Sequence, residues 1–101
     1  MNQDTFNDVY RQMEKEEHDT MINKGNEYTN ATDRLANFKR NAQLTGQTAK
    51  QVWSIYFMKH IDAIMSYVKT GTVQSEDIKS RILDARNYLA LLRALIEEEG
   101  K

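Results

Sequence analysis

Three ionisable residues interrupt the apolar faces of three expected helices. Glu17, His60 and Asp84 each stand where a rotation of about 100° per residue would place an apolar neighbour. A buried carboxylate is costly unless a cation, a metal or several hydrogen bonds compensate its charge. If the three faces meet, the three side chains share one polar pocket. Carboxylates from facing helices are the usual way in which a helical bundle holds a divalent metal, and oxygen ligands suit Mg²⁺ or Mn²⁺.

Two further acids, Glu14 and Asp77, are placed in the pattern so that they could complete such a metal site. Each candidate also has an ordinary structural explanation that the sequence leaves open. His60 fits a hydrogen-bonded histidine of the core, while Glu14 and Glu17 belong to a charged run that fits a solvated surface. Asp77 suits the first turn of a helix, where the helix dipole favours an acid. Asp84 suits a salt bridge to a neighbouring arginine.

The composition limits the class of protein. With 101 residues, 40% of them hydrophobic and 29% charged, the chain can form one modest core and does not have the composition of a disordered segment. The formal net charge of −1 argues against binding to duplex nucleic acid. Cysteine is absent, which excludes disulfides, thiolate metal sites and cysteine nucleophiles. No signal-peptide pattern and no apolar run of membrane-spanning length are present.

The helical spacing of the apolar residues predicts an all-α protein. The expected helices cover residues 5–24, 32–44, 48–69 and 76–98. Gly25 is expected to end the first helix as a left-handed cap. Thr45-Gly46 and Thr70-Gly71 are expected to end the second and third helices, and Thr48 with Gln51 is expected to form a capping box for the third. Ser75 is expected to cap the fourth. Short connections favour antiparallel neighbours, so we predict a single domain over residues 1–101, built as a four-helix bundle-like unit.

The last expected helix carries two stripes. The dominant stripe consists of Ile78, Ile82, Ala85, Leu89, Leu92 and Ile96. The second stripe is acidic toward its N-terminal end and apolar toward its C-terminal end, and consists of Asp77, Asp84, Tyr88, Leu91 and Leu95. Its apolar part is a candidate partner or dimer face, because a bundle this small has more apolar helix surface than one core uses. We therefore expect a homodimer or a larger homo-oligomer.

Four short pieces of sequence occur in an order that resembles a known group of proteins. They are Lys-x-x-Glu-Tyr at residues 24–28, Asp-Arg-Leu-x-Asn-Phe at 33–38, Lys-His at 59–60 and Arg-Ile-x-Asp-x-x-Asn-Tyr-Leu-x-Leu-Leu at 81–92. Over roughly residues 20–96, the chain resembles small phage and prophage proteins grouped with the MazG-like, all-α nucleoside triphosphate pyrophosphohydrolases and their nucleotide-modification relatives. The resemblance implies a helical bundle that pairs into dimers or tetramers, binds magnesium through acidic clusters and cleaves a nucleotide to its monophosphate and pyrophosphate.

The resemblance also implies roles for particular acids. The usual signature combines Glu-x-x-Glu on one helix with Glu-x-x-Asp on a later one. Glu14 and Glu17 match the first pair in spacing, but Arg81 stands three residues before Asp84, where an acid is expected. Asp77, one turn further back, could replace that acid. The departure affects catalysis more than nucleotide binding. The implied catalytic residues are Glu17 and Asp84, and the implied metal ligands are Glu14, Glu17, Asp77 and Asp84.

The implied substrate-binding residues surround the first expected turn and continue on the later helices. Glu27 and Tyr28 are expected on a loop at the mouth of the pocket, where basic residues of the set would contact phosphate. A tyrosine or Trp53 would stack on a base. The full substrate-binding set is Lys24, Glu27, Tyr28, Asn37, Arg40, Lys59, His60 and Asn87.

Two functions from different classes follow. The first is a MazG-like domain that binds, and hydrolyses if its acids suffice, a nucleoside triphosphate with Mg²⁺ or Mn²⁺. No phosphate-binding glycine loop, nucleophile elbow or HExxH motif is present, so any chemistry would be metal-assisted hydrolysis. The second is a non-catalytic phage protein that blocks a host defence factor or sequesters a nucleotide signal. By resemblance, either would act in the cytoplasm of an infected or lysogenic bacterium.

Overall fold

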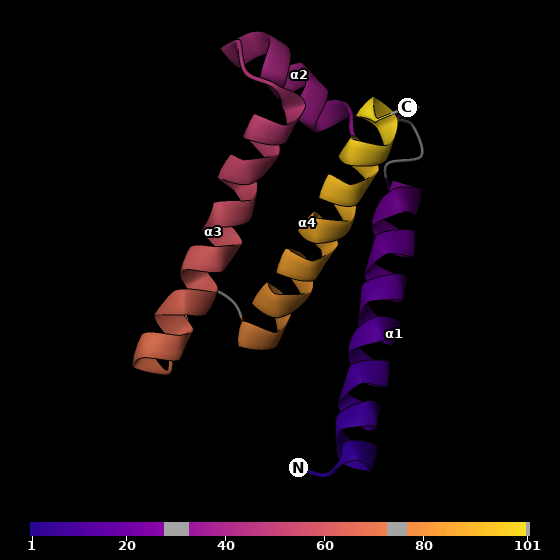
Figure 1. The fold of residues 1–101 in the computed structure, drawn as a ribbon, viewed down its shortest axis with the longest axis vertical. Helices are drawn as coiled ribbons and strands as arrows, with labels where there is room; N and C mark the ends of the chain where they lie inside the picture. The colour runs from indigo at the N-terminus through magenta and orange to yellow at the C-terminus, as the bar shows by residue number, and fades with distance from the viewer. Residues whose placement is uncertain (28–32, 73–76, 101) are drawn as a thin grey trace. The chain divides into compact units, whose positions relative to one another are not determined.

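The structure is a computed structural model that describes residues 1–27, 33–72 and 77–100, without the side chains of residues 24–27. In these residues the chain is all α-helical, as predicted. The helices are α1 (Gln3–Glu27), α2 (Ala36–Thr45), α3 (Ala49–Thr70) and α4 (Ile78–Glu99). The chain divides into two compact units, Met1–Thr32 and Asp33–Lys101 (Figure 1). None of the helices in the described ranges is both long and apolar enough to span a membrane.

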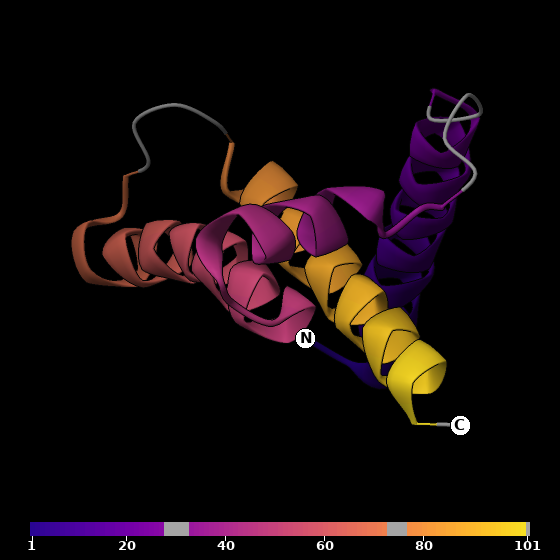
Figure 2. The same cartoon turned by 90° about the horizontal axis from the view of Figure 1, so that it is seen from above.

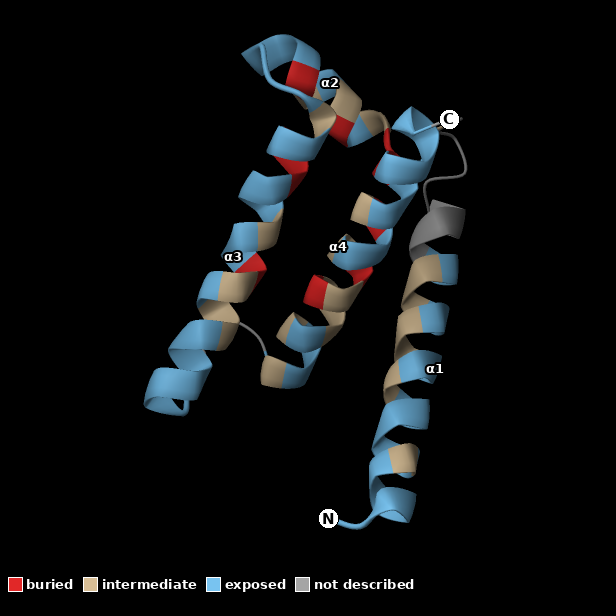
Figure 3. Cartoon of the chain, in the orientation of Figure 1, coloured by how far each residue is buried: buried red, intermediate tan, exposed pale blue. Residues whose placement is uncertain are grey.

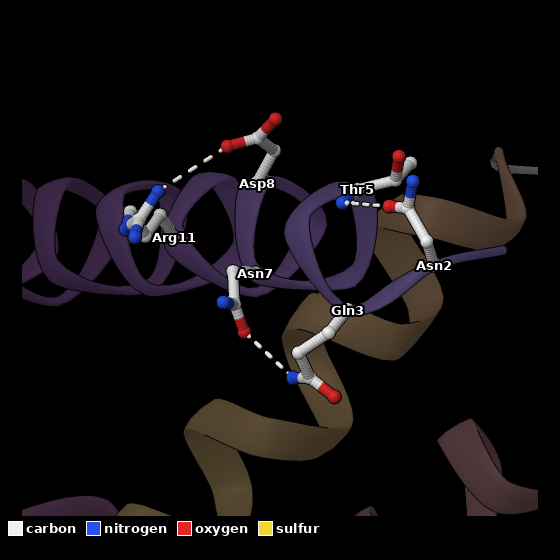
Figure 4. Close-up of polar contacts among 6 residues, drawn as sticks. All are labelled: Asn2, Gln3, Thr5, Asn7, Asp8 and Arg11. Carbon is white, nitrogen blue, oxygen red and sulfur yellow. Dashed lines mark hydrogen bonds and ion pairs between the residues drawn. The ribbon is translucent and has the colours of Figure 1, made fainter.

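The first unit is one long helix with a capped start. Asn2 Oδ1 accepts a hydrogen bond from the backbone N–H of Thr5 at 2.9 Å, which satisfies a donor that the helix itself leaves unpaired. This cap starts α1 at Gln3, two residues earlier than the sequence predicts. Figure 4 shows the cap with two nearby side-chain contacts, which join Gln3 to Asn7 and Arg11 to Asp8.

The prediction that Gly25 ends the first helix is wrong, because α1 continues through Gly25 to Glu27. A glycine within a helix costs roughly 1 kcal/mol relative to alanine, but it keeps the backbone hydrogen-bond pattern. The backbone hydrogen bonds of the long helix α1 can offset that cost at Gly25. Glu27 is therefore part of a helix and not of a loop, which corrects its predicted position. Tyr28 lies outside the described residues.

The prediction that the second helix starts at residue 32 or 33 is also wrong. Asp33 Oδ1 accepts a hydrogen bond from the N–H of Leu35 at 2.9 Å, and the Asp33 carbonyl accepts one from the N–H of Ala36 at 3.1 Å. An aspartate that bonds its own backbone two residues on forms a local turn, which competes with the helix. Regular helix therefore begins only at Ala36.

The third helix begins and ends close to where the sequence predicts. Thr48 Oγ1 accepts the N–H of Gln51 at 3.1 Å, and Gln51 Oε1 accepts the N–H of Thr48 at 2.8 Å, which completes the predicted capping box. Gly46 (φ 71°) and Gly71 (φ 77°) adopt the left-handed conformation after α2 and α3. Only glycine adopts it without steric cost, so both residues end their helices as predicted.

The fourth helix starts at Ile78, two residues later than predicted, with Asp77 at its N-cap. Asp77 Oδ1 accepts a hydrogen bond from the N–H of Lys79 at 3.4 Å. Ser75, the predicted cap, lies outside the described residues. The carboxylate of Asp77 thus has a structural role at the start of α4, where the helix dipole favours a negative charge.

In the second unit, α3 and α4 lie side by side and run in opposite directions, and α2 crosses one end of the pair (Figures 1 and 2). The buried positions of these helices face one another (Figure 3). The apolar core of the unit consists of Leu35, Phe38, Ala42, Val52, Trp53, Ala85, Leu91 and Leu95.

The stripe of α4 that enters this core is the second one. Leu91 and Leu95 are 8% and 2% exposed, whereas Ile82, Leu89 and Ile96 of the dominant stripe are 38%, 50% and 49% exposed. The suggestion that the apolar part of the second stripe is an open partner face is therefore wrong. With the second stripe facing α3, the backbone carbonyl of Tyr88 accepts a hydrogen bond from the indole N–H of Trp53.

Ion pairs tie the end of α4 to the starts of the two preceding helices. Lys39 Nζ lies 2.5 Å from Asp33 Oδ2 and also contacts the carboxylate of Glu98. Lys50 Nζ lies 2.9 Å from Glu99 Oε2. These side chains are 35–49% exposed, so solvent screens each pair and its contribution is modest.

Removal of the capping box should destabilise the second unit. We expect Thr48→Ala to lower the free energy of unfolding by about 1 kcal/mol, because the N–H of Gln51 loses its acceptor. Urea denaturation followed by circular dichroism measures the change. Thr5→Ala is the matched control, since Thr5 is an exposed residue inside α1. Equal stability of the Thr48→Ala variant and the parent chain would contradict the importance of the cap.

The Asp33–Lys39 pair should make stability depend on pH. The hydrogen bond from Lys39, followed by that from the Leu35 N–H, lowers the pKa of Asp33 below its ordinary 3.8. The hydrogen bonds to Asp33 and then Glu98 raise the pKa of Lys39 above its ordinary 10.5. The pair therefore stabilises fully between these two ordinary values. Its contribution is lost as pH falls below 3.8 through the lowered pKa of Asp33, or rises above 10.5 through the raised pKa of Lys39.

We expect Asp33→Asn to have a lower urea midpoint than the parent chain at neutral pH, with a difference that shrinks as pH falls below about 3.8. Urea titrations at a series of pH values measure it. Asp19→Asn, an exposed change on α1, serves as control and should leave the midpoint nearly unchanged. A difference independent of pH would show that the carboxylate charge of Asp33 contributes nothing.

Candidate functional site

The candidate site depends on the register between α3 and α4. Trp53 Nε1 donates a hydrogen bond to the backbone carbonyl of Tyr88 at 2.6 Å, and the Trp53 ring stacks on Phe57 with centroids 4.6 Å apart. Because the helices are antiparallel, seven residues forward from Trp53 and seven back from Tyr88 lead to a second facing pair, His60 and Arg81. At 1.5 Å of rise per residue, this pair lies about 10 Å along the interface from the first.

His60, Arg81 and Asp84, which we call the His60 cluster, come together at this point. Arg81 Nη1 lies 3.4 Å from His60 Nδ1, and Asp84 Oδ2 lies 3.9 Å from the same nitrogen. His60 is 9% exposed, while the other two are half-buried. The Tyr88 ring lies against the imidazole with centroids 4.9 Å apart. His60 and Asp84, two of the three residues expected to share a polar pocket, therefore lie close together, while the place of Glu17 in that pocket stays a prediction.

The two contacts of His60 Nδ1 belong to different protonation states. A neutral imidazole can accept a hydrogen bond from the guanidinium of Arg81 at this nitrogen, whereas a protonated imidazole can only donate there. At 3.9 Å the Asp84 carboxylate is too distant for a hydrogen bond, but it is close enough to attract the protonated ring. The cluster therefore has one group suited to each charge state of His60.

Asn87 is the most unusual polar residue near the cluster. It is 4% exposed, and neither its Oδ1 nor its Nδ2 has a hydrogen-bond partner among the described residues. It follows Asp84 by three positions, so the two side chains are neighbours on the surface of α4. Buried amides are nearly always hydrogen-bonded, and each unmade bond is costly. The Asn87 amide thus offers one acceptor and two donors that the described chain does not use.

The chemistry of the cluster suits an anion better than a divalent cation. A guanidinium and an imidazole that converge on one point supply N–H donors for a phosphate oxygen, and arginine binds phosphate in a fixed geometry. Among the described residues, no three carboxylates or histidines gather so that they could hold a metal ion. At the cluster, Asp84 lies beside His60, and the guanidinium of Arg81 lies beside the same imidazole nitrogen. These donors by themselves do not fit Mg²⁺ or Mn²⁺.

The remaining predicted acids lie elsewhere or have other roles. Glu14 is exposed and Glu17 is half-buried on α1, and both belong to the first unit. Their part in a site with Asp84 stays a prediction. Asp77 caps α4, which accounts for its position without a metal.

The predicted substrate-binding residues are spread over several elements. On α2, Arg40 Nη2 donates to Asn37 Oδ1 at 3.2 Å, and both side chains are exposed. Lys59 is exposed on α3, although His60 beside it is buried. Lys24 lies in the last turn of α1, where side chains are not described. Trp53 is 8% exposed and donates within the core, so the expectation that it stacks on a base is wrong.

Sequence reasoning missed Arg81 as a member of the site and treated it as a gap in an acidic motif. A signal was present, because Arg81, Asp84 and Tyr88 follow the i, i+3, i+7 spacing that continues through Leu91 and Leu95. This places Arg81 on the same stripe as Asp84. The stripe identifies the face of α4, and only the register with α3 shows that Arg81 faces His60.

Comparisons of the chain with protein-family models, with curated proteins and with solved structures give no match. The resemblance to the MazG-like group therefore rests on the four short pieces of sequence alone.

The unpaired amide of Asn87 should reduce stability. We expect Asn87→Leu, a change of similar volume, to raise the free energy of unfolding by about 1 kcal/mol, because it removes two buried polar atoms without partners. Urea denaturation measures the change. Asn37→Leu, an exposed change on α2, should stay within about 0.5 kcal/mol of the parent chain. A loss of stability in Asn87→Leu would show that the amide is hydrogen-bonded in solution.

Proposed function

We propose that this chain binds a nucleoside triphosphate, or a closely similar phosphate-bearing nucleotide, at the His60 cluster. The observation that carries the proposal is the convergence of Arg81 Nη1 and His60 Nδ1, 3.4 Å apart, within the packed interface of α3 and α4. Polar groups in such a place cost stability and need a reason to be there. A phosphate group would accept hydrogen bonds from the Arg81 guanidinium and, when the imidazole carries a proton on Nδ1, from His60.

Asn87 and Asp84 favour a ligand that carries hydroxyl or amino groups in addition to a phosphate. The Asn87 amide has unused donors and an unused acceptor, and the half-buried Asp84 carboxylate accepts hydrogen bonds from hydroxyl or amino groups. Sugars and bases carry such groups, whereas inorganic phosphate does not offer the same variety. The proposal is therefore a nucleotide rather than a simple anion.

Hydrolysis to monophosphate and pyrophosphate is the activity that the resemblance adds to this proposal. The resemblance implies that Glu17 and Asp84 are the catalytic carboxylates and that Mg²⁺ or Mn²⁺ is the cofactor. The described donors of the second unit do not form a metal site by themselves, and Arg81 stands where the resemblance expects an acid. Binding is therefore the primary function proposed, and turnover is tested separately.

A second candidate is a non-catalytic interaction protein, which the exposed stripe of α4 favours. Ile82, Leu89 and Ile96 are 38–50% exposed at seven-residue spacing, so they form a continuous apolar strip along the helix. Arg86 and Arg93 border one edge of this strip. An apolar strip with a basic edge fits the acidic, amphipathic surface of a protein partner, such as a host factor.

The nucleotide proposal is tested by calorimetric titration of the chain with a panel of ribo- and deoxynucleoside triphosphates, with and without Mg²⁺. We expect one class to bind, and Arg81→Ala to weaken its affinity about tenfold or more through loss of charge-assisted hydrogen bonds. Arg93→Ala is the matched control, because Arg93 is an exposed arginine of the same helix, paired with Glu97 at 3.0 Å. Circular dichroism checks that each variant stays helical.

Failure of every nucleotide to bind, or equal affinity of the parent chain and Arg81→Ala, would reject the proposal and favour the interaction protein. Turnover is read from the same mixtures by ion-exchange chromatography. If monophosphate and pyrophosphate appear together, Glu17→Gln and Asp84→Asn should each abolish them while binding persists. Turnover that survives both changes would remove these carboxylates from the catalytic assignment.

A further inference from the structure

The C-terminal half of α3 has an exposed apolar face that the second unit does not cover. Met58, Met65 and Val68 are 49%, 59% and 71% exposed, and half-buried Ile61 lies among them. Their i, i+3, i+7, i+10 spacing places them in one stripe along the helix, which we call the Met65 face. Single exposed apolar residues are ordinary on a protein surface, but a continuous stripe indicates a contact.

The Met65 face contains no charged residue. Half-buried Phe57 and Ile64 widen it on one edge, toward the packed side of the helix. The opposite edge is charged, with Asp62 and Lys69 both exposed. A stripe with an apolar centre and one charged edge is the pattern of a helix that packs against another helix.

The charged edge indicates which partner fits. Asp62 and Lys69 are separated by seven residues, so they lie about 10 Å apart on the same edge of α3. In an antiparallel pair of identical helices related by a two-fold axis, the same edges face each other. An axis close to Met65 would bring Asp62 of each copy beside Lys69 of the other, which gives two equivalent ion pairs around an apolar centre.

We propose that the Met65 face is the interface through which two copies of this chain associate, with their α3 helices antiparallel. The apolar stripe supplies the buried surface, and the Asp62–Lys69 pairs set the orientation. The His60 cluster lies on the side of α3 that packs against α4, so this association leaves it intact. The proposal does not depend on the nucleotide proposal.

The exposed strip on α4 fits a second copy less well. Arg86 and Arg93 border the same edge of the strip formed by Ile82, Leu89 and Ile96. An antiparallel pair of α4 helices would therefore bring Arg86 of each copy beside Arg93 of the other, so that no ion pair forms between these residues across the interface. Of these two faces of the second unit, the Met65 face is complementary to itself and the α4 strip is not.

Sedimentation velocity over a range of concentrations tests the proposal with the full chain. We expect a species with twice the 11.8 kDa mass of the chain. Met65→Glu should raise the dimer dissociation constant about tenfold or more, because it places two carboxylates near the two-fold axis. Ser66→Glu is the matched control, since this exposed residue is turned about 100° away from the face and should leave the constant nearly unchanged.

Charge exchange tests the orientation. Asp62→Lys and Lys69→Asp should each weaken the dimer about two- to fivefold, and the double variant should recover the parent affinity, because its pairs are restored with opposite sign. A chain that sediments only as a monomer at the highest concentration would overturn the proposal. So would equal effects of Met65→Glu and Ser66→Glu, or a double variant that is weaker than either single one.

Discussion

The hydrogen bond from the Trp53 indole to the Tyr88 carbonyl determines how the second unit is put together. A buried indole N–H needs an acceptor, and a helix carbonyl has a second lone pair beyond the one used within the helix. At 2.6 Å this bond between a side chain of α3 and the backbone of α4 allows little sliding of one helix along the other, and Phe57 of α3 stacks on the Trp53 ring. A shift of one turn would break the bond and bury an unpaired donor.

The position of the candidate site follows from that register. With Trp53 opposite Tyr88, two turns of each helix lead to His60 opposite Arg81, and Asp84 occupies the next turn of α4. At the Trp53 end of the interface, apolar side chains surround one indole–carbonyl hydrogen bond, whereas the His60 cluster carries three ionisable groups. The same interface therefore has one end that provides stability and another that bears the cost of polar groups.

Electrostatic contacts hold the opposite end of the helix pair. Lys39 bridges Asp33 and Glu98, and Lys50 pairs with Glu99, so two short connections meet the last turn of α4. Each pair is weak by itself because it is partly exposed. Together they orient α2 across the pair, so that Phe38 reaches Tyr88 with ring centroids 6.3 Å apart. Tyr88 thus contacts Phe38 of α2 with its ring, accepts the indole N–H of Trp53 of α3 at its backbone carbonyl, and lies against the imidazole of the site.

The sequence alone determined the all-α class, the ends of α2 and α3 at Gly46 and Gly71, and the capping box of Thr48. These features depend on local chemistry: helical periodicity, backbone conformations that glycine adopts, and bonds between residues three apart. Local chemistry also misled where two local patterns competed, as when the Asp33 turn delayed α2 and the helix continued through Gly25.

Only the tertiary structure decided which stripe of α4 packs against α3. Both stripes carry enough apolar residues to form a core, and a helical wheel gives no information about the neighbouring helix. The tertiary structure likewise placed Arg81 against His60 and left the Met65 face exposed, because a register between two helices depends on contacts that no single helix carries.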